Sequence, residues 1–395
     1  MPTKDRNRLS TIEKLEDQVA AKVVSESLHL KKGDSLTVET WNNGFPLATK
    51  VVLEARKLGA HPIMIFEDED AYVEGVKNTP KDAIGKMGKH EYQLLSATDA
   101  YFFIPNEVLE GYTKRLTAAE VDQATTYGDS WYEAAEKAKL RGARMSFGFA
   151  GKELAKILGK KLDEVVAHQL KATLVDFSGL KSAGKQLESQ MIPNTVGVID
   201  SGGAELEFEF GDGGRVEDGV VDEDDVSAGN NMSYLPPGMV VKNIKRDSLN
   251  GKVKLSATLS WRGILDDAVL EFEGGRLTTW SSKNSKKMLD SLISDQPESE
   301  REVSSLIIGL NPAIRYGYGQ DRFVEGSIGL SGLEFTGILR KGTLRANQSK
   351  LVEKGKLVTK YDRKTILLPR VERKVSPLHE KLHDRFRWGR LRTCG

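Results

Sequence analysis

The spacing of apolar residues changes near residue 190, and this change constrains the fold more than any other feature of the chain. Before it, a strand at residues 35–41 precedes a helix at 46–57 that ends at Gly59, and a second strand follows at 61–66. A strand, a helix and a strand in this order form a βαβ unit, which favours a parallel sheet flanked by helices. The first half is therefore predicted to be an α/β domain.

After residue 190 apolar and polar residues alternate, as they do in strands with one face in water. The alternating segments are residues 195–199, 205–210, 252–261 and 268–273. Helical spacing recurs within this half at 286–293 and 298–306. The second half is therefore predicted to be a β-rich α+β domain.

The chain of 395 residues is long enough to bury two hydrophobic cores. The periodicity predicts four further elements in the first half, namely strands at 100–104 and 144–149 and helices at 118–140 and 152–174. The predicted division is an α/β N-terminal domain at 1–190, a β-rich domain at 191–350 and a basic C-terminal extension at 351–395.

Charge is distributed unevenly along the chain, although the net charge is only +1. Residues 340–395 contain 17 Lys or Arg and 5 Asp or Glu, whereas residues 205–225 contain ten acids and a single Arg215. One interpretation is that the two regions are solvated or contact each other across the fold or a dimer interface. The alternative is that the basic tail binds an anionic partner, either RNA or an acidic protein.

Several classes of protein are not expected from this sequence. It has no run of 18 apolar residues and its first ten residues are polar, so we predict no membrane span and no signal peptide. Cys394 is the only cysteine, which excludes an intrachain disulfide and a four-cysteine zinc site. These features predict a cytoplasmic protein.

Four motifs in order resemble the aminopeptidase T family of thermophilic metallopeptidases, which includes aminopeptidase S. They are LKKGDSLTVET at 30–40, EARKLGAHP at 54–62, TVGVIDSGGAELEF at 195–208 and IGLNP at 308–312. The resemblance extends over most of residues 11–350. It implies an aminopeptidase T-like homodimer whose C-terminal domain binds two divalent metals through two glutamates, two histidines and an aspartate.

The residues at the positions implied by this resemblance are poor metal ligands. Asn231 stands at the first glutamate, Ser305 stands at the second with Glu302 three residues away, and Glu325 alone remains a carboxylate. No histidine occurs between His168 and His379, so a shift of alignment cannot supply the two imidazoles. We therefore expect no metal, no cofactor and no activity as a metalloaminopeptidase.

A second metal-binding motif occurs in the tail. His379, Glu380 and His383 form H-E-x-x-H, which on a helix places two imidazoles beside a general base. Such a site needs a third ligand and a substrate cleft, and the twelve residues after His383 contain neither His nor Glu. We interpret residues 377–390 as an exposed basic helix, and the sequence leaves open whether the motif binds metal.

Two functional hypotheses follow from these observations. The first is a non-peptidase protein that binds a small molecule, peptide or protein in the cleft between its domains. The second is an enzyme of metal-independent chemistry on the same scaffold, for which the candidate residues are Glu325, Asn231, Ser305, Lys341 and Arg345. A further alternative is a metal-dependent aminopeptidase with atypical ligands. A closed pocket around Glu325 with a cation in reach would favour the enzyme.

Overall fold

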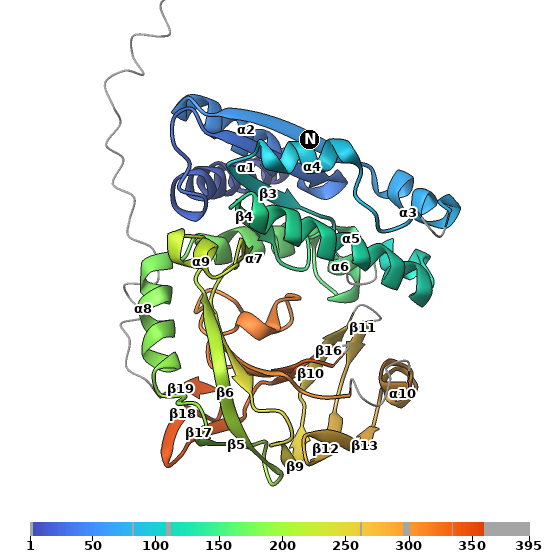
Figure 1. Cartoon of the computed structure of the whole chain (residues 1–395), viewed down its shortest axis with the longest axis vertical. Coiled ribbons are helices and arrows are strands. Elements are labelled where there is room, and N and C mark those ends of the chain that lie inside the picture. The colour runs from blue at the N-terminus through green and yellow to red at the C-terminus, as the bar shows by residue number, and fades with distance from the viewer. Residues whose placement is uncertain are drawn as a thin grey trace, which may run out of the picture.

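The computed structural model describes residues 3–80, 83–107, 112–260, 263–294, 301–333 and 335–358. These residues form a helix-rich half around a parallel sheet and a β-rich half around an antiparallel sheet. In Figure 1 the helix-rich half lies at the top and the β-rich half at the bottom. The predicted fold class, α/β followed by β-rich α+β, is therefore confirmed.

The first sheet has five parallel strands in the order β2-β1-β3-β4-β7. Their bounds are β1 Ser35–Trp41, β2 His61–Glu67, β3 Ala100–Ile104, β4 Arg141–Met145 and β7 Met232–Leu235. Side chains alternate between the two faces of each strand. On β1, Leu36 and Val38 are buried on one face, whereas Glu39 and Trp41 point to the other.

Helices cover both faces of this sheet. They are α1 Thr3–Lys22, α2 Phe45–Leu58, α3 Glu69–Asn78, α4 Lys89–Ser96, α5 Ala118–Lys137, α6 Lys152–Ile157 and α7 Leu162–Thr173. α2 packs against β1 and β2 and is joined by α1, whereas α3, α4 and α5 lie over the face of Glu39. α2 ends at Gly59, whose φ of 88° is left-handed and stops the helix. No described helix combines the length and apolar character needed to cross a membrane.

The second sheet contains 14 described strands, which pair antiparallel. Their bounds are β5 Val196–Asp200, β6 Glu205–Glu217, β8 Met239–Ile244, β9 Asn250–Lys254, β10 Ala257–Ser260, β11 Gly263–Leu265, β12 Ala268–Glu273, β13 Arg276–Ser282, β14 Ser305–Gly309, β15 Ile328–Ser331, β16 Phe335–Leu339, β17 Thr343–Ala346, β18 Ser349–Glu353 and β19 Lys356–Leu357. Three helices accompany them, α8 Phe177–Glu188, α9 Glu223–Ser227 and α10 Lys286–Ser294.

The chain crosses between the two sheets more than once. β7 follows β6 of the second sheet but pairs in parallel with β4 of the first, and α8, which precedes residue 190, packs against β6 and β8. A single cut at residue 190 therefore does not separate the two sheets. Residue 350 lies inside β18, so the β-rich half extends beyond the proposed boundary there as well.

Four element predictions need correction. The strand predicted at 144–149 lies earlier in the chain, as β4 Arg141–Met145. The helix predicted at 152–174 is divided into α6 and α7 around Gly159, whose φ is left-handed. The strand predicted at 252–261 is two strands, because Leu255 donates to Ala268 and Ser256 donates to Ile338, which lie on different neighbours. Of the helix predicted at 298–306, the described residues 301–306 are not helical, and Ser305 and Leu306 belong to β14, between β8 and β15.

A small apolar cluster joins the two halves. It contains Phe323, Ala172, Met239, Ile307, Ile314 and Val324, all buried. Ala172 comes from α7 of the first half, and the other members come from the second half. Asn311 strengthens this junction by donating from its buried Nδ2 to the carbonyls of Ala172 and Pro237, at 3.0 and 2.7 Å.

Candidate ligand-binding site

A cavity of about 610 Å³ lies between the parallel sheet and helices α3, α4 and α5. Strands β1, β2, β3 and β4 supply the side chains of its floor, and the three helices supply its roof. A volume of this size is typical of sites for small organic molecules.

Two glutamates, Glu39 and Glu67, reach the floor of the cavity from adjacent strands, and we call them the acid pair. The register places Glu67 beside Trp41, two residues beyond Glu39 on the same face. Burial raises the pKa of Glu39 to about 7, and the charge of Glu67 adds to this rise, whereas the Tyr101 hydroxyl that donates to Glu39 and the charge of Arg144 oppose it. Burial also raises the pKa of Glu67.

Aromatic side chains line the cavity in two groups. The Trp41 cluster consists of Trp41, Tyr72 and Tyr112, and the Trp131 cluster consists of Trp131, Tyr101 and Tyr132. Ring centroids lie 4.8 to 5.6 Å apart in the first and 5.0 to 5.3 Å apart in the second. Trp41 is 5% exposed, and its Nε1 has no hydrogen-bond partner among the described residues. This indole N–H is therefore an unused donor in the cavity wall.

Arg144 on β4 is the cation of the cavity lining. Its guanidinium lies 5.2 Å from the ring centroid of Phe103 and 5.9 Å from that of Tyr234. Its Nε is buried and has no hydrogen-bond partner within the described part of the chain. The lining thus combines one arginine with the acid pair and Glu91, so carboxylates outnumber the cation.

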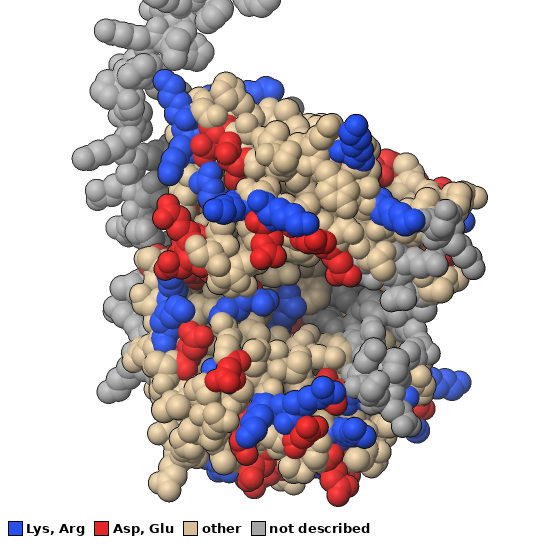
Figure 2. Space-filling view, viewed as in Figure 1, with Lys and Arg blue, Asp and Glu red and all other residues tan. Residues whose placement is uncertain are grey.

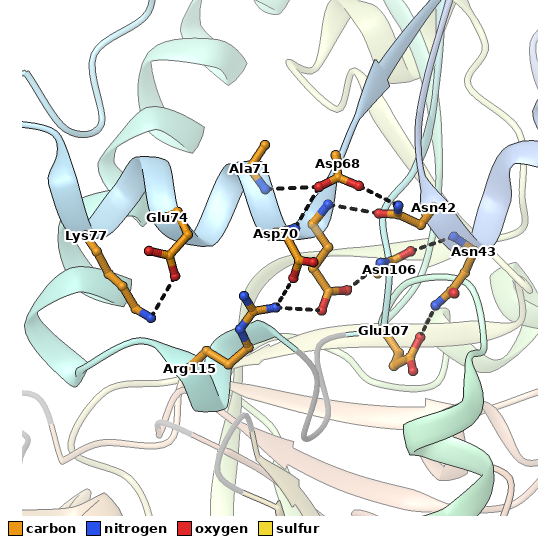
Figure 3. A network of polar contacts seen from close by, with 11 residues as sticks. Asn42, Asn43, Asp68, Asp70, Ala71, Glu74, Lys77, Asn106, Glu107 and Arg115 are labelled. Carbon is orange, nitrogen blue, oxygen red and sulfur yellow. Dashed lines mark hydrogen bonds and ion pairs between the residues drawn. The ribbon is translucent and has the colours of Figure 1, made fainter.

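A polar network at the carboxyl ends of β1, β2 and β3 fixes the start of α3 (Figure 3). Asp68 caps α3 by accepting from the backbone N–H groups of Asp70 and Ala71, both at 3.1 Å, and Asn42 donates to Asp68 at 2.8 Å. Asn42 also accepts from the backbone N–H of Glu69 at 2.9 Å. Because α3 forms part of the roof, this network sets the position of a cavity wall.

Further charged residues lie where the two halves meet, beside a hollow that Figure 2 shows between them. Arg322 of the β-rich half donates to the Ser146 hydroxyl at 2.8 Å and lies 4.2 Å from the Phe147 ring centroid. Burial lowers the pKa of Arg322 to about 10, although the charge of buried Glu217 opposes this shift. The contacts of Arg322 with Ser146 and Phe147 join the halves just after β4.

The residues proposed for a metal or catalytic site are spread over the molecule. Asn231 precedes β7, at the opposite end of the strand from the junction, and its buried Nδ2 donates to the Leu140 carbonyl at 2.8 Å. Ser305 begins β14 and lies between β8 and β15. Arg345 pairs with Glu205 at 2.8 Å, which is one contact between the basic and acidic regions.

Glu325 and Lys341 lie away from the cavity between the sheet and α3–α5. The side chain of Glu325 is half-buried and does not line the cavity between the sheet and α3–α5. Lys341 is exposed. Glu302 forms an ion pair with Arg246 at 3.0 Å. The motif His379, Glu380 and His383 lies outside the described residues.

Comparisons with known proteins agree with this architecture. The family model described as thermophilic metalloprotease (M29) matches residues 12–304. The chain belongs to the thermophilic metalloprotease family M29. Among solved structures, wild-type AmpT from Thermus thermophilus has a TM-score of 0.64 at 13% identity, and the alignment covers 88% of this chain and 99% of AmpT.

A second similar structure is 2,5-dihydroxypyridine dioxygenase from Pseudomonas putida KT2440. It has a TM-score of 0.57 at 13% identity, over 90% of this chain and 98% of that one. Curated protein sequences gave no significant match. At these identities the structural likeness establishes the M29 fold alone.

The donor set does not fit the metal pair that the M29 resemblance implies. The amide of Asn231 and the hydroxyl of Ser305 are neutral, weak ligands, whereas a dinuclear site needs several carboxylates and imidazoles. In the part of the chain that the structure describes, no three or more His, Cys, Asp or Glu side chains are grouped so that they could hold a metal ion.

Sequence reasoning named none of the charged cavity residues as candidates. Glu39, Glu67 and Arg144 all lie on strands of a parallel sheet that helices cover on both faces. Such strands are ordinarily apolar, so a charged residue on one of them could have indicated a functional site. The nearest partners of Glu39 come from other strands, and local periodicity does not identify them.

Proposed function

We propose that this M29 member is an aminopeptidase-like protein that binds a small organic ligand in the cavity beneath α3–α5 and lacks dinuclear-metal peptidase activity. The observation that carries the proposal is the convergence of the acid pair, Arg144 and two aromatic clusters on one cavity of about 610 Å³. Buried, titratable groups around an apolar pocket are typical of ligand sites.

The residues at the implied metal positions support the same proposal. Asn231 is hydrogen-bonded to Leu140 at the far end of β7, and Ser305 belongs to the middle of the second sheet. Asn231 and Ser305 belong to different sheets, and among the described residues no three or more His, Cys, Asp or Glu side chains are grouped so that they could hold a metal ion and activate a water molecule. The homodimer and the anionic partner of the basic tail remain predictions.

The test is a peptidase assay on the full chain loaded with zinc, cobalt or manganese. We expect leucine p-nitroanilide to release no more p-nitroaniline than metal and buffer alone. Glu325→Gln is the matched variant, because Glu325 is the one carboxylate at an implied metal position, and it should give the same baseline. Metal-dependent turnover by the wild type that disappears in Glu325→Gln would overturn the proposal.

A further inference from the structure

The acid pair gives the β1–β2 end of the cavity an excess of negative charge. Glu67 is half-buried, and no described residue forms a hydrogen bond or an ion pair with its carboxylate. Glu39 accepts a hydrogen bond from Tyr101 and has no described ion pair. A buried or half-buried carboxylate without a cation is costly, and a positively charged occupant would offset that cost.

The aromatic clusters favour the same kind of occupant. Indole and phenol rings attract cations to their faces and also pack against apolar groups. The Trp41 and Trp131 clusters both line the cavity that contains the acid pair. The walls therefore suit a molecule that has both a positive charge and an apolar body.

Arg144 favours the ionised form of Glu39 but forms no described ion pair with either member of the acid pair. It comes from β4, two strands away from β1, and its guanidinium lies against the Phe103 and Tyr234 rings. The electrostatic field is therefore divided, with carboxylates at the β1–β2 side and a guanidinium at the β4 side. A ligand with its cationic group over β1 and β2 avoids repulsion by Arg144.

We propose that this cavity binds an organic ammonium ion with an aromatic or branched apolar body, the ammonium lying on the acid pair and the body between the Trp41 and Trp131 clusters. This inference rests on the proposed function, because it names the ligand class of the same cavity. Charge-assisted hydrogen bonds from the ammonium to the two carboxylates supply the specificity.

The test is calorimetric titration of the full chain at pH 8 with three probes of one shape, 2-phenylethylamine, 2-phenylethanol and 3-phenylpropionate. We expect the amine to bind at least about tenfold more tightly than the alcohol or the carboxylate, the difference typical of a charge-assisted hydrogen bond. Quenching of tryptophan fluorescence gives a second readout, because Trp41 and Trp131 line the cavity.

Two pairs of variants test separately whether amine binding depends on the carboxylate charge and on the open volume of the cavity. Glu67→Gln should weaken amine binding about tenfold or more, whereas Glu13→Gln, an exposed change on α1, should leave it unchanged. Gly75 lines the cavity, and a Cβ added there meets nothing within 4 Å. Gly75→Phe therefore has room for its ring and should block the cavity. Glu74→Phe adds the same ring to the exposed position before it and should have no effect.

The affinity should also rise with pH between 6 and 8, because the ammonium binds the ionised form of Glu39. The ionisable groups that face Glu39 are Glu67 of β2, Tyr101 of β3, Arg144 of β4, Glu91 of α4 and Tyr127 of α5. Equal affinity for amine and alcohol, no amine binding at millimolar concentration, or unchanged binding by Glu67→Gln would each overturn the ligand class. The peptidase assay is independent of these outcomes.

Discussion

The two halves of the molecule differ in how they hold their polar side chains. In the helix-rich half, Glu39, Glu67 and Arg144 face one cavity, and several of their polar atoms have no described partner. In the β-rich half, Ser305 lies in β14 and Glu325 lies before β15, whereas Asn231 precedes β7 of the parallel sheet. The M29 fold thus retains both sheets, and the acid pair, which has no described ion pair, lies beside the parallel one. The buried Nε atoms of Arg322 and Arg340 that lack a hydrogen-bond partner belong to the β-rich half.

The two similar structures share this fold but carry different names. One is AmpT and the other is a 2,5-dihydroxypyridine dioxygenase, yet both align over nearly their whole length with this chain. A fold that carries such different names does not determine the chemistry of its members. The side chains of each site must decide it.

The largest expected effect on stability comes from disrupting the junction between the two halves. Phe323 is fully buried in the cluster that joins the halves. Phe323→Ala should lower the free energy of unfolding by about 3–5 kcal/mol, the usual cost of a large core cavity. Denaturant titration measures it, and Leu53→Ala, at a residue 49% exposed, is the control that should cost less than about 0.5 kcal/mol. A loss below about 1 kcal/mol would contradict tight coupling of the halves.

The free energy of unfolding should depend on pH in opposite ways through His168 at the junction and Glu39 in the cavity. The pKa of His168 is lowered to about 4, mainly by burial and also by Arg315, so this histidine contributes stability that is present above pH 6.5 and lost as the pH falls towards 4. The pKa of Glu39 is raised to about 7, so its contribution is present below pH 4.5 and lost as the pH rises towards 7. Each contribution is on the order of 1–3 kcal/mol.

Between about pH 4.5 and 6.5, the contribution of His168 to stability rises with pH and that of Glu39 falls. Single variants should reveal the two contributions separately. Relative to the wild type, the stability of Glu39→Gln should rise more steeply with pH, and that of His168→Gln should rise less steeply or fall. Glutamine at 168 keeps an acceptor for the Arg315 amide, which donates to His168 Nε2 at 3.1 Å. Parallel curves for all three proteins would contradict both assignments.

The smallest expected effect concerns helix capping. Asp68 caps α3 at the cavity and Asp176 caps α8 at the second sheet. Asp68→Ala and Asp176→Ala should each lower the melting temperature by a few degrees, because each removes an N-cap. Only Asp68→Ala should also weaken binding of 2-phenylethylamine, by a few-fold, since α3 forms a cavity wall. Equal binding by both variants would show that the network at α3 does not position the site.

Local periodicity predicted much of the fold. The strands at 35–41, 100–104 and 268–273 match β1, β3 and β12, because alternation in the first and third and a short apolar run in the second were sufficient. β7 was missed, since it has only four residues and its parallel partner lies about ninety residues earlier. The helix at 298–306 was wrong because pairing with β8 and β15 overrides the helical spacing there.

The site was less predictable than the fold. Its side chains come from Glu39 in β1 to Met232 in β7, and only the tertiary structure brings them together. The implied metal positions, in contrast, follow from the resemblance of the sequence to its relatives. Resemblance directs attention to the site that relatives use, and Glu39, Glu67 and Arg144 belong to a different one.

The path of the chain through β7 also bears on the order of synthesis. The parallel sheet lacks one edge strand until residue 235 has left the ribosome, after β5 and β6 have been made. Until then β4 exposes an unpaired strand edge, which is a template for pairing with other chains. The helix-rich half therefore cannot finish folding while it is being translated on its own, and a nascent chain stalled before β7 should be prone to aggregation.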